Sequence, residues 1–351
     1  MKVSRDIFFF IALVLFVTIT ARAESDKKLT TPSETFFPAI ALSSQHPFFT
    51  SPASNENADT EDARFKKLRQ WYEATTHSSS TFAVGFRPYG VVFDGANIWV
   101  SNTESDSLTK LRASDGTVLG TYAVGFYPRG VAFDGANIWV ANSGSDSITK
   151  LRATDGTVLG TFAVGFYPYG VAFDGANIWV TNSGSNDVTK LRATDGAVLG
   201  TFAVGFNPRG VLFDGANVWV ANSNSNSVTK LRASDGVVLS TYAVGWVPKW
   251  IAFDGTNIWV TNYGSGKVTK LRASDGTVLG TYAVGIYPYG IVFDGVNIWV
   301  TNAGSNNVTK IRANDGTVLG TYDVGINPRG VVFDGTNIWV VNYDSDTITK
   351  L

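Results

Sequence analysis

The chain has 351 residues, enough to bury a large core, and its 28 Lys and Arg residues are balanced by 29 Asp and Glu residues. This balance argues against nucleic acid as a partner, because nucleic-acid-binding domains concentrate positive charge. The absence of cysteine excludes disulfides, thiolate metal sites and cysteine nucleophiles. We therefore expect packing to stabilise the fold.

The N-terminal segment, residues 1–23, has the three parts of a secretory signal peptide. Lys2 and Arg5 precede an apolar run from Ile7 to Thr20, and an Ala-Arg-Ala motif that ends at residue 23 follows. The apolar run is shorter than a membrane-spanning helix needs, so an uncleaved anchor is the less favoured alternative. The sequence predicts an exported protein, periplasmic or secreted, with no membrane span after cleavage.

Residues 24–80 are rich in Ser, Thr, Pro and Asn and show little apolar periodicity, which indicates a flexible linker. Residues 61–75 are the exception, because a short helix capped by Thr60 would fit there. Its apolar stripe would contain Phe65, Leu68, Trp71 and Tyr72. Such a helix more simply docks on the neighbouring domain, and binding to a second protein is the alternative.

From residue 81 to residue 351 the chain repeats one pattern seven times at a period of 40 residues. Each copy contains one tryptophan at the same place: Trp99, Trp139, Trp179, Trp219, Trp259, Trp299 and Trp339. Each copy also contains four short segments rich in β-branched and aromatic residues, joined by Asp-Gly or Ser-rich turns, without helical periodicity. This pattern predicts an all-β fold, a seven-bladed β-propeller of four-stranded antiparallel blades, with the tryptophans in the core between blades.

The two ends of the repeat array are complementary. The first copy is preceded by a spare fourth strand from Thr81 to Gly85, whereas the seventh copy stops within its third strand at Leu351. We therefore expect the N-terminal strand to complete the last blade by pairing with Ile348 to Leu351. This pairing would close the ring and cover the edge of the last blade.

One stretch of the chain resembles a known repeat. The segment PYGVAFDGANIWVTN, Pro168 to Asn182, followed by DVTKLRATDGAVLGTFAVG, is similar to the repeat of YVTN-family β-propellers. Trp-Val-Thr-Asn stands here where that family has its name-giving Tyr-Val-Thr-Asn. The resemblance covers residues 81–351 and implies a seven-bladed propeller, but it implies little about function, because the family has no common defined activity.

A more distant similarity is to propeller enzymes. A resemblance to streptogramin lyases would imply a His base with a divalent metal, but His46 and His77 are the only histidines and both precede the repeats. Gluconolactonase-like propellers hold a metal with acidic and Asn ligands near the axis. One Asn recurs in every copy, as at Asn102. An Asn that caps the end of the second strand explains this identity in each blade more simply than a metal site does. The sequence therefore predicts no catalytic residue, no metal and no cofactor.

Sequence variation is concentrated on one face of the predicted propeller. Because strand direction alternates, the loops between blades and the loops after the second strand of each blade emerge on the same face. The first type includes GFYPRG, Gly125 to Gly130, and the second includes ANSGSDS and TNYGSGK. The Asp-Gly turns of the opposite face barely change. We interpret the varied face as the functional one.

The position just before the innermost strand of each copy should lie at the mouth of the central channel, and we call these seven residues the channel ring. They alternate between tyrosine and basic residues: Tyr89, Arg129, Tyr169, Arg209, Lys249, Tyr289 and Arg329. Four cations and three phenols around one axis favour an anionic or sugar-like ligand. The alternative is that these side chains merely cover apolar surface at loop positions.

The fifth copy departs from the pattern, because Trp250 stands where the other six copies have glycine. We expect its indole to point into the channel, where it would either pack as a plug or form a stacking platform for the ligand. Trp250 is therefore the eighth candidate for ligand binding.

Together, these observations predict an exported, monomeric binding or interaction module whose small ligand or protein partner occupies the varied face. Two alternatives remain open. One is a propeller enzyme of the lyase or lactonase type with its site in the central channel, and the other is a structural cell-surface protein.

Overall fold

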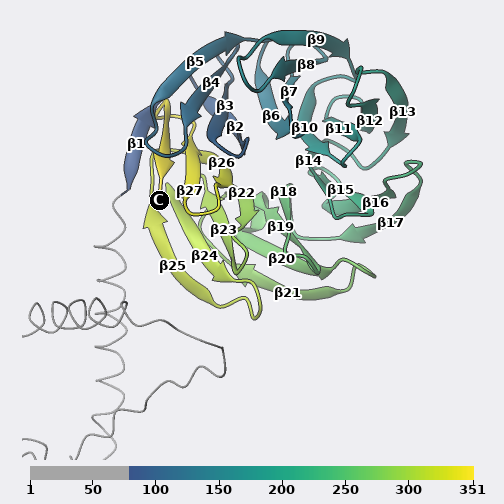
Figure 1. The fold of residues 1–351 in the computed structure, drawn as a ribbon. Coiled ribbons are helices and arrows are strands. Elements are labelled where there is room, and N and C mark those ends of the chain that lie inside the picture. The colour runs from purple at the N-terminus through teal and green to yellow at the C-terminus, as the bar shows by residue number, and fades with distance from the viewer. Residues whose placement is uncertain (1–78) are drawn as a thin grey trace, which may run out of the picture. The chain divides into compact units, whose positions relative to one another are not determined.

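The computed structural model describes residues 79–351, and these residues form seven four-stranded antiparallel sheets around a central axis (Figure 1). This architecture confirms the predicted seven-bladed β-propeller. The predicted signal peptide (1–23) and helix (61–75), and nearly all of the predicted linker (24–80), lie outside the described residues. Within residues 79–351, no helix has the length and apolar character needed to cross a membrane.

Each blade contributes one strand to each of four positions, from the axis outward. The innermost strands are β2 (Pro88–Phe93), β6 (Pro128–Phe133), β10 (Pro168–Phe173), β14 (Pro208–Phe213), β18 (Pro248–Phe253), β22 (Pro288–Phe293) and β26 (Pro328–Phe333). The second strands are β3 (Asn97–Asn102), β7 (Asn137–Asn142), β11 (Asn177–Asn182), β15 (Asn217–Asn222), β19 (Asn257–Asn262), β23 (Asn297–Asn302) and β27 (Ile338–Asn342). The third strands are β4 (Ser107–Arg112), β8 (Ser147–Arg152), β12 (Asp187–Arg192), β16 (Ser227–Arg232), β20 (Lys267–Arg272), β24 (Asn307–Arg312) and β28 (Thr347–Lys350). The outer strands are β5 (Val118–Ala123), β9 (Val158–Ala163), β13 (Val198–Ala203), β17 (Val238–Ala243), β21 (Val278–Ala283), β25 (Val318–Asp323) and β1 (Ser80–Ala83), and a 3-10 turn, η1 (Tyr263–Ser265), follows β19.

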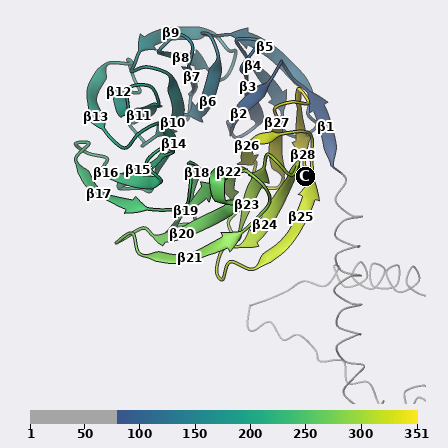
Figure 2. The same cartoon turned by 180° about the vertical axis from the view of Figure 1, so that it is seen from behind.

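The last blade is assembled from both ends of the propeller sequence. Its strand order is β1-β28-β27-β26, so the first strand of the propeller is the outer strand of the seventh blade (Figures 1 and 2). Thr81 pairs with Thr349 and Phe82 with Ile348 in an antiparallel register. The predicted closure of the ring by the N-terminal strand is therefore confirmed.

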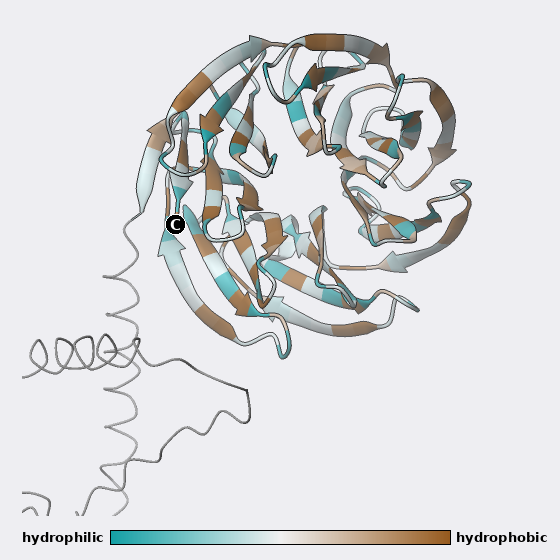
Figure 3. Cartoon of the chain, in the orientation of Figure 1, coloured by the Kyte–Doolittle hydropathy of each residue, from teal (hydrophilic) through white to brown (hydrophobic). Residues whose placement is uncertain are grey.

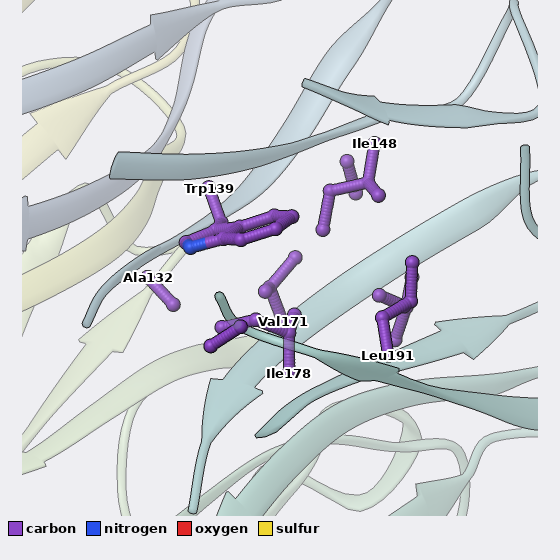
Figure 4. Close-up of a cluster of buried hydrophobic side chains, with 9 residues drawn as sticks. Ala132, Trp139, Ile148, Val171, Ile178 and Leu191 are labelled. Carbon is purple, nitrogen blue, oxygen red and sulfur yellow. The ribbon is translucent and has the colours of Figure 1, made fainter. Parts of the chain in front are cut away.

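The repeated tryptophan fills the core between neighbouring blades, as predicted. Trp139 is fully buried, with Ile148 of its own blade on one side and Val171, Ile178 and Leu191 of the next blade around it (Figure 4). Figure 3 shows that apolar segments recur along the strands of every blade. Because each blade buries its apolar surface against two neighbours, the ring is stabilised as a whole.

The tryptophan also explains why an Asp-Gly turn precedes it. Trp99 Nε1 donates a hydrogen bond to Asp94 Oδ2 at 2.8 Å. Asp94 Oδ1 accepts from the backbone N–H groups of Ala96 and Asn97 at 2.9 and 2.6 Å, and Gly95 has a φ of 97°, which favours glycine. Burial opposes ionisation of Asp94, but the hydrogen bonds from Trp99 and the turn outweigh it and lower the pKa of this carboxyl below its ordinary value.

A buried lysine links neighbouring blades, a role that was not predicted from the sequence. Lys110 Nζ donates to the carbonyl oxygen of Ala153 in the next blade at 2.7 Å and lies 5.0 Å from the centre of the Trp99 ring. Lys350 makes the same link from the seventh blade to the first, through the carbonyl oxygen of Ala113 at 2.9 Å. The contact that joins the seventh blade to the first is thus the same as the contact between consecutive blades.

Candidate functional site

Each innermost strand begins with a β-bulge at its channel-ring residue. In β2, Pro88 pairs with Asn102 and Val91 with Val100, so that Tyr89 and Gly90 together oppose one residue of β3. The same register shift occurs in the other six innermost strands. Because a bulge changes the direction of its side chains, it allows the channel-ring residue to face the axis.

The glycine of the bulge allows the innermost strands to approach closely. A Cβ atom at Gly90 would collide with the backbone carbonyl of Arg129 in the next blade. That carbonyl oxygen accepts a hydrogen bond from Ser101 Oγ at 2.6 Å. This close backbone approach holds the channel-ring residues next to one another.

The structure brings all seven channel-ring residues to one cavity of about 220 Å³, which we call the central pocket. Two further tyrosines, Tyr263 and Tyr343, complete its wall from the loops after β19 and β27. Neither tyrosine was predicted from the sequence as a site residue. A signal was present, because TNYGSGK and VNYDSDT are the two loops of this type that contain an aromatic residue.

Three tyrosines of the channel ring meet at the axis. Tyr89, Tyr169 and Tyr289 are buried, and the Tyr289 hydroxyl shares hydrogen bonds with the hydroxyls of both others. Burial raises the pKa of Tyr89 and Tyr169, and the neighbouring arginines offset this only in part. The phenols of Tyr89 and Tyr169 therefore stay neutral at neutral pH and keep a proton that a hydrogen bond can use.

The four cations of the channel ring lie over tyrosine rings. The distances from cation to ring centre are 4.5 Å for Arg129 over Tyr89, 4.4 Å for Arg209 over Tyr169, 4.4 Å for Arg329 over Tyr289 and 5.1 Å for Lys249 over Tyr263. Each arginine belongs to the blade that follows the blade of its tyrosine. The alternation of Tyr and Arg along the sequence thus produces cation–π pairs between neighbouring blades.

The positive charge of the central pocket has no acidic counterpart in the pocket wall. All nine lining residues are Tyr, Arg or Lys. Ion pairs in the described part of the chain use other arginines, such as Arg87, which lies 2.8 Å from Glu104. Uncompensated positive charge in a partly desolvated cavity attracts anions.

Two guanidinium N–H groups in the pocket lack an acceptor. The Nε atoms of Arg129 and Arg329 are buried without a hydrogen-bond partner. By contrast, Arg209 Nε donates to Asn207 Oδ1 at 3.2 Å. Asn327 is the equivalent of Asn207 in the last blade, but its amide donates to a neighbouring carboxylate instead. Because a buried donor without an acceptor is costly, an anion that accepts from these groups would be stabilised.

Lys249 differs from the other three cations because it is able to lose its proton near neutral pH, whereas arginine is not. Its side chain is buried beside the Tyr263 ring. Burial, followed by the positive charges of Arg209 and Arg329, lowers the pKa of Lys249 to about 7. The pocket therefore holds three permanent positive charges and a fourth that titrates near neutral pH.

Trp250 lies beside the tyrosine cluster and is not part of the pocket wall. The centre of its ring is 6.5 Å from that of Tyr169, and its Cε3 atom lies close to Gly210 of the preceding blade. Its backbone N–H donates to Thr261 Oγ1 at 3.0 Å. These contacts show an indole that packs among the innermost strands next to the pocket.

The described residues contain no candidate metal centre. Within residues 79–351, no three His, Cys, Asp or Glu side chains come together in an arrangement that could hold a metal ion. The channel ring instead supplies N–H and O–H donors and positive charge, which suit an anion and not a cation.

Comparison with solved structures supports the fold. The chain is similar to a structure of hydrazine synthase from Kuenenia stuttgartiensis, with a TM-score of 0.67 and 21% identity, over 76% of this chain and 95% of the other. A streptogramin B lyase structure is as similar, with a TM-score of 0.67 and 21% identity, over 78% of this chain and 96% of the other. At this identity, both likenesses show the β-propeller fold alone. No protein-family model and no curated protein matches the sequence, so the resemblance to the YVTN family is not confirmed.

Proposed function

We propose that this protein binds a small ligand with an anionic group in the central pocket. One observation carries the proposal: Arg129, Arg209, Lys249 and Arg329 converge on a cavity whose wall contains no carboxylate. Like charges that are close together and partly desolvated destabilise the folded protein. A bound anion would offset this cost and accept hydrogen bonds from the free Nε groups of Arg129 and Arg329.

The donors of the pocket favour a phosphate, sulfate or carboxylate group. Guanidinium edges and phenol hydroxyls form charge-assisted hydrogen bonds to such oxyanions. A cavity of about 220 Å³ has room for the anionic group and a small body such as a sugar ring. The faces of the tyrosine rings would allow that body to stack.

An enzyme that acts on such an anion is the second candidate, and Lys249 is the observation that favours it. An amine with a pKa of about 7 has the properties of a general base or a nucleophile at neutral pH. One structurally similar protein is a streptogramin B lyase. The histidine base that a resemblance to streptogramin lyases would imply has no counterpart in the repeats, because His46 and His77 precede them. Lys249 would have to take its place.

We also propose, from the N-terminal sequence, that the protein is exported to the periplasm or the exterior and acts there as a monomer. A closed ring supports the monomer, because its last blade already has its outer strand and needs none from a second chain. The likeness of its repeats to those of the YVTN family is compatible with export.

Calorimetric titration with phosphate, sulfate and citrate tests the anion site. The four substitutions Arg129→Gln, Arg209→Gln, Lys249→Gln and Arg329→Gln should abolish binding, and wild-type affinity should fall as salt is added. A control protein with the same loss of charge carries Arg112→Gln, Arg152→Gln, Arg192→Gln and Arg232→Gln, at half-exposed positions outside the pocket. Anion binding that survives the pocket substitutions would contradict the proposal.

A further inference from the structure

A ring of exposed apolar side chains surrounds the central pocket. Each lies three positions before a channel-ring residue, in the loop that enters an innermost strand, and we call the set the apolar crown: Phe86, Phe126, Phe166, Phe206, Trp246, Ile286 and Ile326. Between 55% and 68% of each residue is exposed to solvent. Seven large apolar residues at equivalent places on one face mark an interaction surface, which single exposed residues do not.

Hydrogen bonds fix the loops that carry the crown. The backbone N–H of Phe126 donates to Ser145 Oγ at 2.7 Å, and its carbonyl accepts from the adjacent loop. The next residue, Tyr127, has a φ of 52°, and its N–H donates to Asp106 Oδ1 at 2.9 Å. The same backbone recurs in the other blades, even at Val247, where a φ of 54° is strained for a β-branched residue. The exposure of the crown is therefore built into ordered loops.

The symmetry of the ring favours a flat partner. The crown residues occupy equivalent positions in seven similar four-stranded blades, which form a ring (Figure 2). Because the blades repeat around one axis, we expect the seven crown residues to face the same direction. A flat surface is able to contact all of them together, whereas a rounded protein surface or a peptide contacts only part of such a ring. Apolar residues such as Val118 and Leu119 are also exposed, but they lie on the outer strands, away from the pocket.

The residue types match the interface of a lipid bilayer. Phe, Trp and Ile insert at the boundary between headgroups and acyl chains, and Tyr and Trp are enriched at the level of the headgroups. Three exposed tyrosines, Tyr127, Tyr167 and Tyr287, each follow a crown residue. A second copy of the chain is a poorer partner, because a face-to-face dimer would oppose two pockets of uncompensated positive charge.

We propose that the varied face docks on the surface of a phospholipid bilayer, with the crown in the interface and an anionic headgroup in the central pocket. The headgroup part rests on the proposed anion site, whereas the contact of the crown with the bilayer does not. Docking of this kind combines insertion of apolar side chains with attraction of the anionic headgroup to the four cations of the central pocket.

A cysteine introduced into the cysteine-free full chain tests which face meets the bilayer. Phe166→Cys places an environment-sensitive fluorophore on the crown, and Val296→Cys places it in the turn after β22, at the other end of the blade. The two positions are 64% and 67% exposed. Vesicles of phosphatidylcholine mixed with phosphatidylglycerol should raise the emission intensity of the label at position 166 several-fold and shift its emission to shorter wavelength. The emission of the label at position 296 should stay unchanged. Because both variants carry the same residues 1–78, the comparison isolates the face.

The same labels define the results that would overturn the proposal. No fluorescence response at the crown, or an equal response at both positions, rules out docking by this face. Phe206→Cys, labelled in the same way, is a second crown position that controls for a local folding defect at position 166. A response to protein concentration without vesicles would assign the crown to self-association instead. Equal insertion into vesicles of phosphatidylcholine alone overturns the headgroup part. Titration with free phosphate tests the pocket separately, so that failure of the anion site and failure of docking are distinguished.

Discussion

The guanidinium of Arg129 lies 4.5 Å from the centre of the Tyr89 ring, although the two residues belong to neighbouring blades. The pairs Arg209 with Tyr169 and Arg329 with Tyr289 repeat this contact. The cations are thus positioned by aromatic rings and not by carboxylates. Their charge remains available to a ligand because no acidic group of the pocket wall neutralises it.

Anion binding should weaken as the pH rises through about 7, the value to which the pKa of Lys249 is lowered. Above this pH the ammonium group of Lys249 loses its proton, and the pocket loses one positive charge. Arg209 and Arg329, which also line the pocket, stay charged. A bound anion favours the charged amine, so binding should take up a proton. Calorimetry with sulfate, which does not titrate near pH 7, in buffers with different ionisation enthalpies measures that uptake. Lys249→Arg should bind with little pH dependence, and a variant that keeps the wild-type dependence would exclude Lys249 as its cause.

Trp250→Gly should destabilise the propeller by about 2–3 kcal/mol, somewhat less than the loss of a fully buried tryptophan, because the indole packs beside Tyr169. Anion affinity should change little, since Trp250 is not part of the pocket wall. Denaturant unfolding and phosphate titration measure the two effects. Trp246→Ser, at an exposed position, is the matched control for stability. A loss of affinity without a loss of stability would instead support a stacking platform.

Deletion of Ser80–Ala83 should lower the melting temperature and promote aggregation, because β28 would lose its outer partner. A point substitution tests the same closure without removing the strand. The ring centres of Phe82 and Trp339 are 5.6 Å apart. Phe162 and Trp139 form the equivalent pair in a blade built from one continuous segment, with ring centres 5.7 Å apart. We expect Phe82→Ala and Phe162→Ala to cost about 2–3 kcal/mol each in unfolding experiments. If only Phe162→Ala proved destabilising, closure by β1 would be wrong.

The propeller should lose stability in acid through the Asp that precedes each tryptophan. The pKa of this carboxyl is lowered from 3.8 in all seven blades. Since the folded pKa lies below the unfolded one, the stabilisation is present above pH 3.8 and is lost as the pH falls through the folded value. Urea unfolding across the acid range measures this slope. Asp174→Asn should reduce the slope and cost about 1 kcal/mol at neutral pH. An unchanged slope would place the acid-sensitive groups elsewhere.

Much of the architecture was predictable because it depends on short or periodic patterns. The period of 40 residues identified the blades, and the spare strand at Thr81 indicated closure. The Asp-Gly turn and the tryptophan that follows it lie within six residues, from Asp94 to Trp99. The channel ring was also predictable, since alternation of strand direction and the inner position of one strand place one residue per blade at the axis.

The sequence by itself therefore determined the all-β propeller, its closure and the seven residues that face its axis. Only the tertiary structure decided the properties that depend on distances between blades. It brought Tyr263 and Tyr343 into the pocket wall, carried Lys110 to the carbonyl of Ala153, and placed Trp250 beside the pocket and not in its wall. The pKa of Lys249 belongs to this second group, because it depends on burial and on arginines 40 and 80 residues away along the chain. Such distances follow from how seven blades pack around one axis, and no local pattern encodes them.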